Sequence, residues 1–281
     1  MTSFAPETLF YIKSFPITNT IISTLFVDLV LLAMIFFVNR KLSLIPGKFQ
    51  NGIEYVIGGF YGFIESIAGP KTAKIFPYFM TFFFFILIAN WSGLIPGIST
   101  FGIYQMHEGF RELVPIYRSA TSDLNTTLAL AIVSLVATHI MAIIALGPTE
   151  YLSRFVPFLP FLISVVKGKP KFNIDKSGPI NFAMSFFSPV VLVFVGLLEL
   201  ISEFVKVISL SFRLFGNITA GEVVLNTVSK IFAFIFPLPF LSLELIVGVV
   251  QALVFAMLTM VFMVILTTSH SEEEHKEVSS A

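Results

Sequence analysis

Long apolar stretches separated by short polar segments dominate the hydrophobicity pattern of this chain. A membrane-spanning helix needs about 20 mainly apolar residues. Stretches of that size lie at about residues 17–39, 75–97, 125–147, 182–228 and 231–268. The pattern therefore predicts an all-α membrane protein with five membrane-embedded helices. We expect a single polytopic domain over residues 1–281, ending in a polar cytoplasmic tail at 269–281.

The fourth apolar stretch is too long for an upright span. At about 1.5 Å per residue, one continuous helix over 182–228 would be roughly twice as long as a hydrocarbon core of about 30 Å is thick. We expect this helix to tilt strongly across the membrane or to break near Gly216 and Gly221. Because the Pro237–Pro239 turn then reverses the chain, the last two helices are predicted to form a long, strongly tilted hairpin.

Residues 51–68 differ from the apolar stretches because they mix Tyr, Phe and Ile with Glu54, Glu65 and four glycines. This mixture is typical of an amphipathic helix that lies at a membrane interface. We predict such a helix at the cytoplasmic interface; an ordinary loop is the alternative.

The composition agrees with a membrane protein and excludes several other classes. The chain is 56% hydrophobic and 12% charged, with no net charge and a mean hydropathy of +0.91. Bulk charge therefore indicates no nucleic-acid partner. The chain has no cysteine, which excludes disulfides and thiolate sites. Nucleotide-binding and hydrolase motifs are absent, so we expect neither a cofactor nor ATP hydrolysis by the chain itself.

Basic residues gather in two of the connections between the apolar stretches, and such bias sets the orientation of a membrane protein. Five spans with this alternation place the N-terminus outside and the C-terminus in the cytoplasm. The residues are Arg40, Lys41, Lys48, Lys71 and Lys74 in one connection and Arg154, Lys167, Lys169, Lys171 and Lys176 in the other.

Polar residues inside the long fourth stretch repeat with the helical period. Charges in apolar spans are costly, so they usually face a cavity or a partner and mark a pathway. At about 100° per residue, six of them fall within roughly a third of one helix circumference. They are Glu199, Glu203, Lys206, Ser209, Arg213 and Asn217. This polar stripe predicts an ion pathway along the helix; a purely structural ion pair is the alternative.

The last apolar stretch carries a second polar face, formed by Glu244, Gly248 and Gln251. The small Gly248 would let a neighbouring helix approach closely. Glu222 lies about half a turn out of phase with Arg213, so we expect it to face other surroundings. Two buried carboxylates on different helices suit a stepwise proton relay.

Arg213 is the centre of this pattern. A guanidinium stays charged inside a protein, so it serves as a fixed cation that attracts a passing carboxylate and obstructs cation leakage. His139 and Asp28 are weaker candidates, which we interpret as satisfied polar groups. The cluster of His270, Glu272, Glu273, Glu274 and His275 has the composition of a metal site. We interpret it as a solvated tail and predict no metal.

Five segments that cover most of the chain resemble subunit a of the F-type ATP synthase. They are SLSFRLFGNITAGE (209–222), VQALVFAMLT (250–259), IPGKFQNGIEYV (45–56), NWSGLIP (90–96) and SDLNTTLALA (122–131). The resemblance implies an all-helical, noncatalytic channel subunit in the lipid bilayer. Its partners would be the c-subunit ring, the b subunits and the remaining ATP synthase subunits, and it would carry protons or sodium.

The resemblance also implies roles for individual residues. Arg213 takes the place of the essential arginine that faces the carboxylate of each passing c subunit. Asn217 and Gln251 are its polar neighbours at the same interface. Further correspondences are Glu222 and Glu244 in the half-channel opposite to the side of ATP synthesis, Glu199 at an acidic position, and Asp123 and Asn125 on the entry side. His139 is an additional entry-side candidate, which the resemblance does not itself supply.

Some relatives have His where this chain has Glu222 or Glu244, which leaves the working pH open. The Gly-Glu pair at 221–222 favours a bacterial plasma (inner) membrane, although an organelle membrane is the alternative. Two other functions compete: a self-contained secondary cation transporter and a membrane scaffold with a structural ion pair. The transporter would normally show an internal repeat, which the sequence lacks.

Overall fold

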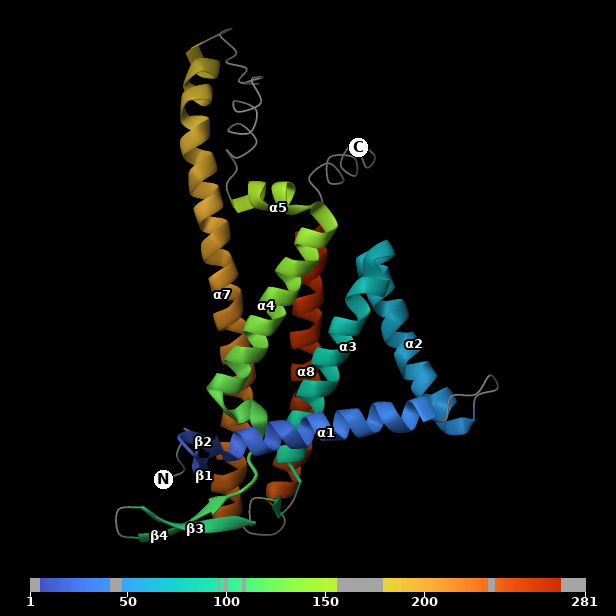
Figure 1. Ribbon diagram of the computed structural model, residues 1–281, viewed down its shortest axis with the longest axis vertical. Helices are drawn as coiled ribbons and strands as arrows, with labels where there is room; N and C mark the ends of the chain where they lie inside the picture. The colour runs from blue at the N-terminus through green and yellow to red at the C-terminus, as the bar shows by residue number, and fades with distance from the viewer. Residues whose placement is uncertain are drawn as a thin grey trace. The chain divides into compact units, whose positions relative to one another are not determined.

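The computed structural model describes residues 6–40, 47–95, 97–98, 101–107, 110–155, 179–231 and 236–268. Helices dominate these residues (Figure 1). The chain divides into two compact units, one from residues 1–131 and 210–261 and the other from 132–209 and 262–281. The predicted tail at 269–281 and the basic residues Lys167–Lys176 lie outside the described residues.

The first unit contains most of the helices. In chain order it holds β1 (Thr8–Ile12), β2 (Phe15–Thr18), α1 (Asn19–Arg40), α2 (Lys48–Ala68), η1 (Gly69–Lys71), α3 (Thr72–Gly93), β3 (Gly102–His107), β4 (Phe110–Pro115), η3 (Ala120–Ser122) and the first turns of α4 (Leu124–Leu146). It also includes residues 210–231 of α7 (Pro179–Ile231) and 237–261 of α8 (Pro237–Thr267).

Two small antiparallel hairpins were not expected from the apolar pattern. β1 pairs with β2, and β3 pairs with β4 in a register that runs from Gly102 opposite Pro115 to His107 opposite Phe110. Both hairpins lie in segments that connect or precede apolar helices. The backbone hydrogen-bonding groups of such segments have no helix to satisfy them, and strand pairing does so.

The helix predicted over 51–68 forms. It is α2, which begins three residues earlier, at Lys48, and ends at Ala68. It packs against α3 through aromatic rings, with Phe60 centred 5.6 Å from Phe79 and 5.0 Å from Phe83. Gly69, at φ +55°, follows α2 in a backbone conformation that favours glycine. Figure 1 shows α2 and α3 as neighbouring helices that meet at one end. The loop alternative for 51–68 is therefore wrong.

α3 contacts α8 closely at Gly248, as the small residue predicts. A β-carbon added to Gly248 would lie 3.3 Å from Cβ of Asn90. Asn90 Nδ2 donates to the Gly248 carbonyl oxygen at 3.2 Å, and Trp91 Nε1 donates to the Leu245 carbonyl oxygen at 3.1 Å. The start of the NWSG segment thus fixes α3 to the helix that carries Glu244 and Gln251.

The second unit combines the rest of α4, α5 (Pro148–Phe155), the N-terminal part of α7 and the last turns of α8. Gly147, at φ +83°, separates α4 from α5. The ring of Tyr151 in α5 lies 5.9 Å from His139 of α4. Lys206 of α7 lies 4.8 Å above the ring of Phe262 in α8, a cation–π distance.

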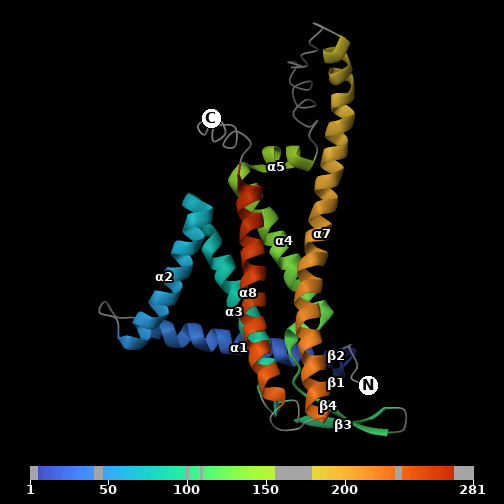
Figure 2. The same ribbon diagram turned by 180° about the vertical axis from the view of Figure 1, so that it is seen from behind.

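α7 is one continuous helix from Pro179 to Ile231. Of the two alternatives for this helix, a strong tilt or a break near Gly216 and Gly221, the break does not occur. Figure 2 shows the C-terminal part of α7 beside the N-terminal part of α8, as a hairpin requires.

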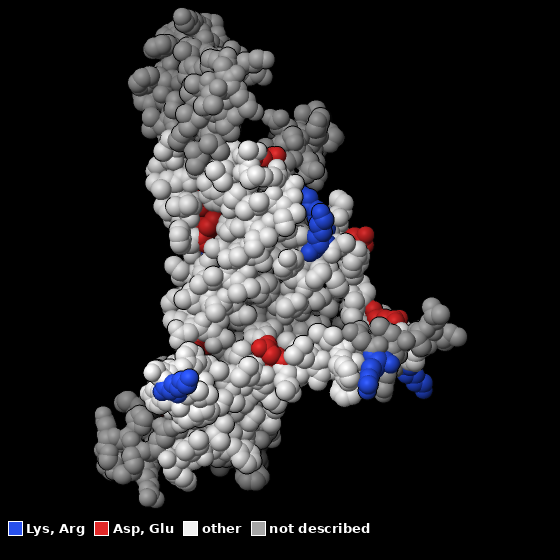
Figure 3. Space-filling view, viewed as in Figure 1, with Lys and Arg blue, Asp and Glu red and all other residues white. Residues whose placement is uncertain are grey.

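Four segments of the described chain are long and apolar enough to cross a membrane: Asn19–Val38, Gln50–Gly93, Leu124–Leu146 and Pro237–Thr267. α7 is not among these four segments. The predicted number of five spans is therefore not established by length and composition. On the face seen in Figure 3, charged side chains form only a few separate patches, as expected for a surface that faces lipid.

Candidate functional site

Arg213 lies exposed on α7 among apolar neighbours. Phe212 beside it is 56% exposed and Ile208 is 54% exposed. Within the part of the chain that the structure describes, no carboxylate lies within ion-pair distance of Arg213. A charge on an apolar face is costly in a membrane unless a partner or water meets it.

One turn after Arg213, a hydrogen bond joins α7 to α8. Asn217 Nδ2 donates to Gln251 Oε1 at 2.8 Å. Gln251 is only 4% exposed. The helical pitch placed Arg213 and Asn217 on one face, and the structure brings the predicted partner Gln251 to that face.

A cavity of about 580 Å³ lies between α7 and α8 beside this bond. Most of its wall is apolar. Its polar or glycine lining consists of Asn217, Gly221, Glu244 and Gln251. A cavity of this size has room for several water molecules, since one water occupies roughly 30 Å³ in the liquid.

Glu244 packs directly against the backbone of α7 at Gly221. A β-carbon on Gly221 would overlap the Glu244 carboxyl group, so this position requires glycine. Glu244 is buried, and its Oε1 has no hydrogen-bond partner among the described residues. A buried polar atom without a partner is unfavourable and often marks a functional group or an ion site.

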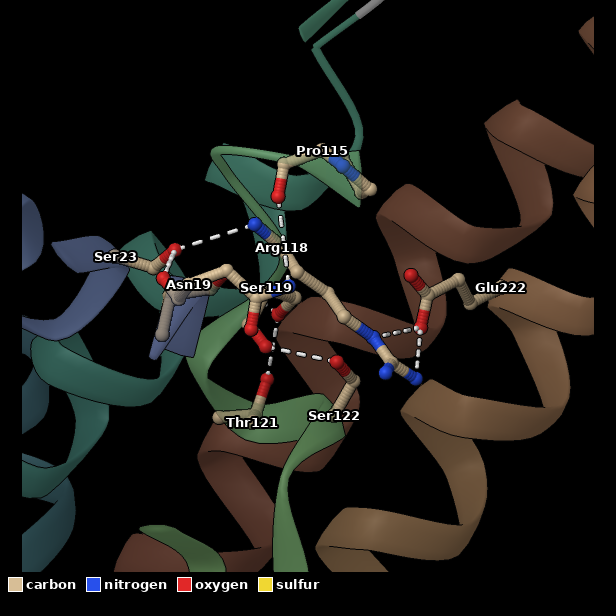
Figure 4. A network of polar contacts seen from close by, with 9 residues as sticks. Asn19, Ser23, Pro115, Arg118, Ser119, Thr121, Ser122 and Glu222 are labelled. Carbon is tan, nitrogen blue, oxygen red and sulfur yellow. Dashed lines mark hydrogen bonds and ion pairs between the residues drawn. The ribbon is translucent and has the colours of Figure 1, made fainter. Parts of the chain in front are cut away.

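Glu222 does not face Arg213, as its phase on the helix predicts, and is instead paired with Arg118 (Figure 4). Arg118 Nε and Nη2 both donate to Glu222 Oε2, at 3.3 and 3.2 Å. The sequence pattern did not identify Arg118 as a site residue, because it counted only as a charge in a connection. Its position just before the SDLN segment was the signal available.

Hydroxyl groups fix the segment that carries Arg118. The Arg118 backbone N–H donates to Ser23 Oγ at 3.3 Å, and Ser119 Oγ donates to the Ala89 carbonyl oxygen at 3.1 Å. Thr121 Oγ1 donates to Asn90 Oδ1 at 2.7 Å. This short segment is therefore bonded to both α1 and α3.

Asp123 has a local structural task at the start of α4. Its Oδ1 accepts from the Asn125 backbone N–H at 2.9 Å, an N-cap arrangement, and its Oδ2 accepts from Thr20 Oγ1 at 3.1 Å. Asn125 is exposed. Nearby, burial raises the pKa of Tyr117. An entry-side role for Asp123 and Asn125 stays a prediction.

The second unit holds its own polar cluster, centred on the buried Glu203. Lys206 Nζ donates to Glu203 Oε1 at 2.7 Å, and His139 Nε2 lies 3.7 Å from Glu203 Oε2. The hydroxyl of Tyr151 lies 2.9 Å from His139 Nδ1. Burial, followed by the negative charges of Glu203 and Glu199, raises the pKa of Tyr151.

The remaining members of the polar stripe are less enclosed. Glu199 is half-buried and Ser209 is exposed. His139 was grouped by sequence with Asp123 and Asn125, whereas its contacts are with α5 and α7. No group of three metal-ligating side chains occurs among the described residues.

Comparison with known proteins shows the family of this chain. A family model described as ATP synthase A chain matches residues 21–168 and 171–264. The chain belongs to this family. The matched ranges include α7, α8 up to residue 264 and the segment around Arg118, so the ATP synthase A chain family covers every part of the site described above.

Similar proteins that carry the corresponding name match this chain over more than three quarters of their length. The chain is 31% identical to ATP synthase subunit a of Moorella thermoacetica, over 93% of this chain and 96% of that protein. It is 32% identical to ATP synthase subunit a of Desulfotalea psychrophila, over 82% and 78% respectively. It is also 32% identical to "ATP synthase subunit a, sodium ion specific" of Propionigenium modestum, over 92% and 77%. Together with the apolar helices, these likenesses identify a multi-pass membrane protein of the ATP synthase A chain family.

Proposed function

We propose that this chain is the noncatalytic a subunit of an ATP synthase and carries ions past a rotating ring of c subunits. The exposure of Arg213 on an apolar helix face is the observation that carries the proposal. A fixed cation at that place would meet the carboxylate of a partner. The cavity beside it, whose polar lining is Asn217, Glu244 and Gln251, would supply water and ions. Membership of the family supports the same function.

The first half-channel would use Glu222 and Glu244. The cavity between α7 and α8 joins Glu244 to Asn217 and Gln251, one turn from Arg213. An ion would pass from Glu222 to Glu244 and then neutralise a carboxylate on a c subunit. The unpaired Oε1 of Glu244 supports a role in binding the ion.

Arg213 would separate this half-channel from a second one. Because its guanidinium stays charged, it would attract the ionised rotor carboxylate and repel a cation that crosses directly. The second half-channel would use the polar residues that precede Arg213 on α7. These are Glu199, Glu203, Lys206 and Ser209.

The proposal extends to assembly and location. The partners would be the c ring, the b subunits and the other ATP synthase subunits. The membrane would be a bacterial plasma membrane, with the N-terminus outside and the C-terminus in the cytoplasm. The coupling ion would be a proton or sodium. Sodium is included because one relative is named as sodium ion specific.

The decisive experiment is ATP-driven acidification of inverted membrane vesicles that contain the assembled synthase with Arg213→Ala or Arg213→Lys. We expect both variants to assemble and to lose coupled pumping. Lys230→Gln is the matched control, because it removes a positive charge from an exposed position on the same helix.

Normal pumping by either Arg213 variant would contradict the gate. Cation transport by the purified chain alone would favour the secondary transporter, and loss of stability without loss of transport would favour the scaffold. Co-purification with a ring of small hairpin subunits would support the synthase. Measuring ATP-driven sodium uptake by the same vesicles, beside their acidification, would identify the ion.

A further inference from the structure

The ion pair between Arg118 and Glu222 engages only one oxygen of the carboxylate. Two donor nitrogens of Arg118, Nε and Nη2, bind Oε2. In Figure 4 the other oxygen of Glu222 points away from the guanidinium. Among the described residues, Oε1 of Glu222 has no hydrogen-bond partner. One oxygen is therefore held while the other stays open.

The guanidinium approaches Glu222 from a segment that is itself fixed. The Arg118 backbone N–H is bonded to Ser23 of α1, and the adjacent Ser119 is bonded to the end of α3. The Arg118 side chain is 12% exposed, whereas that of Glu222 is 33% exposed. The arginine is thus the enclosed partner and the carboxylate the accessible one.

Glu222, which carries the open Oε1, also lies next in the chain to the residue that the Glu244 carboxyl group contacts. Glu222 directly follows Gly221, and the Glu244 carboxyl group packs against Gly221. The orientation of the Glu222 side chain therefore bears on transfer between the two acids. Charge-assisted hydrogen bonds from an arginine fork fix a carboxylate in direction as well as in place.

We propose that Arg118 is a positioning residue for ion transfer, which holds Oε2 of Glu222 so that Oε1 accepts the incoming proton or cation. This inference rests on the proposed function. In the proton case, a proton bonds to Oε1 from water outside and leaves the same atom toward Glu244. Both hydrogen bonds from Arg118 to Oε2 stay in place throughout, so the carboxylate returns to one orientation after each transfer.

The test uses the assembled synthase in inverted vesicles, with ATP-driven acidification expressed per assembled complex. Arg118→Gln removes the charge and one donor of the fork, and we expect a fall in rate of roughly 10- to 100-fold, as misplaced reacting groups cause. Arg118→Lys keeps a cation and should restore much of the rate. The control Lys230→Gln should match the wild type.

A double substitution separates positioning from a merely structural bond. If Arg118 acts through Glu222, then Arg118→Gln combined with Glu222→Gln should be no slower than Glu222→Gln alone. If Arg118→Gln changes only the amount of assembled complex, or pumps at the wild-type rate while Glu222→Gln is slow, the positioning role is wrong. If Glu222→Gln and Arg213→Ala both pump normally, the proposed function itself fails.

Discussion

Asn217 and Gln251 form a 2.8 Å hydrogen bond that joins α7 to α8 one helical turn from Arg213. Gln251 is buried, so loss of its partner would leave a polar group unsatisfied. We expect Asn217→Ala to weaken the α7–α8 contact by about 1–3 kcal/mol and to slow pumping.

A double-mutant cycle with Gln251→Leu measures this contact. The double variant should be less destabilised than the sum of the two single variants, because it removes both polar groups. Thermal unfolding in detergent and vesicle acidification provide the two readouts. Strict additivity would mean that the bond does not couple the helices.

Gly221 and Gly216 offer a matched pair on α7. A β-carbon at Gly221 would overlap the Glu244 carboxyl group, whereas none of the described atoms lies within 4 Å of one at Gly216. We expect Gly221→Ala to displace Glu244, to cost about 1–3 kcal/mol and to block pumping. Gly216→Ala should fold at least as well as the wild type, because alanine favours a helix over glycine by about 1 kcal/mol. Equal pumping by the two variants would show that the position of Glu244 is unimportant.

Lys206 neutralises the buried Glu203. Removal of one partner of a buried pair costs about 3–5 kcal/mol, because it leaves an uncompensated charge. Lys206→Met should therefore lower the thermal stability of the chain strongly, and a second change, Glu203→Gln, should restore most of it. Thermal scans of the detergent-solubilised protein compare the melting temperatures of these variants. If Lys206→Met alone is as stable as Lys206→Met with Glu203→Gln, the pairing is wrong.

Tyr151 provides a pH-dependent contact. Its pKa is raised first by burial and then by the charges of Glu203 and Glu199. A tyrosine with a raised pKa contributes stability that is complete below about pH 10, its value in the unfolded chain, and is lost as pH rises through the folded value. The Tyr151 contact to His139 should therefore persist through neutral pH and weaken only in strong alkali.

The difference in tyrosinate absorbance between the wild type and Tyr151→Phe gives the titration of this phenol. We expect its midpoint to lie above that of free tyrosine and to fall in Glu203→Gln, which removes one of the negative charges. A midpoint below pH 10 would contradict the burial of the hydroxyl.

Much of the fold follows from the lengths of the apolar stretches in the sequence. The helices Asn19–Arg40, Thr72–Gly93 and Leu124–Leu146 begin and end within a few residues of the predicted stretches, because a hydrocarbon core requires long apolar runs. The β3–β4 hairpin could not be found in this way, since its strands are short and belong to a connection between helices.

The site was predictable only where one helix determines it. Helical pitch grouped Arg213 with Asn217 and set Glu222 apart, and both relations hold in the structure. The partners of these residues depend on contacts between distant segments, which periodicity does not specify. Arg118 was therefore missed, and the contacts of His139 with Glu203 and Tyr151 were not foreseen.

The exposure of Arg213 also has a consequence for biogenesis. A newly inserted chain presents this guanidinium on an apolar helix face, where lipid cannot solvate it well. If the proposed partner carries an acidic group, the free energy cost of the exposed guanidinium is highest before assembly and falls when the partner binds. On that proposal, copies made in excess would be less stable than assembled ones and more readily degraded by quality control.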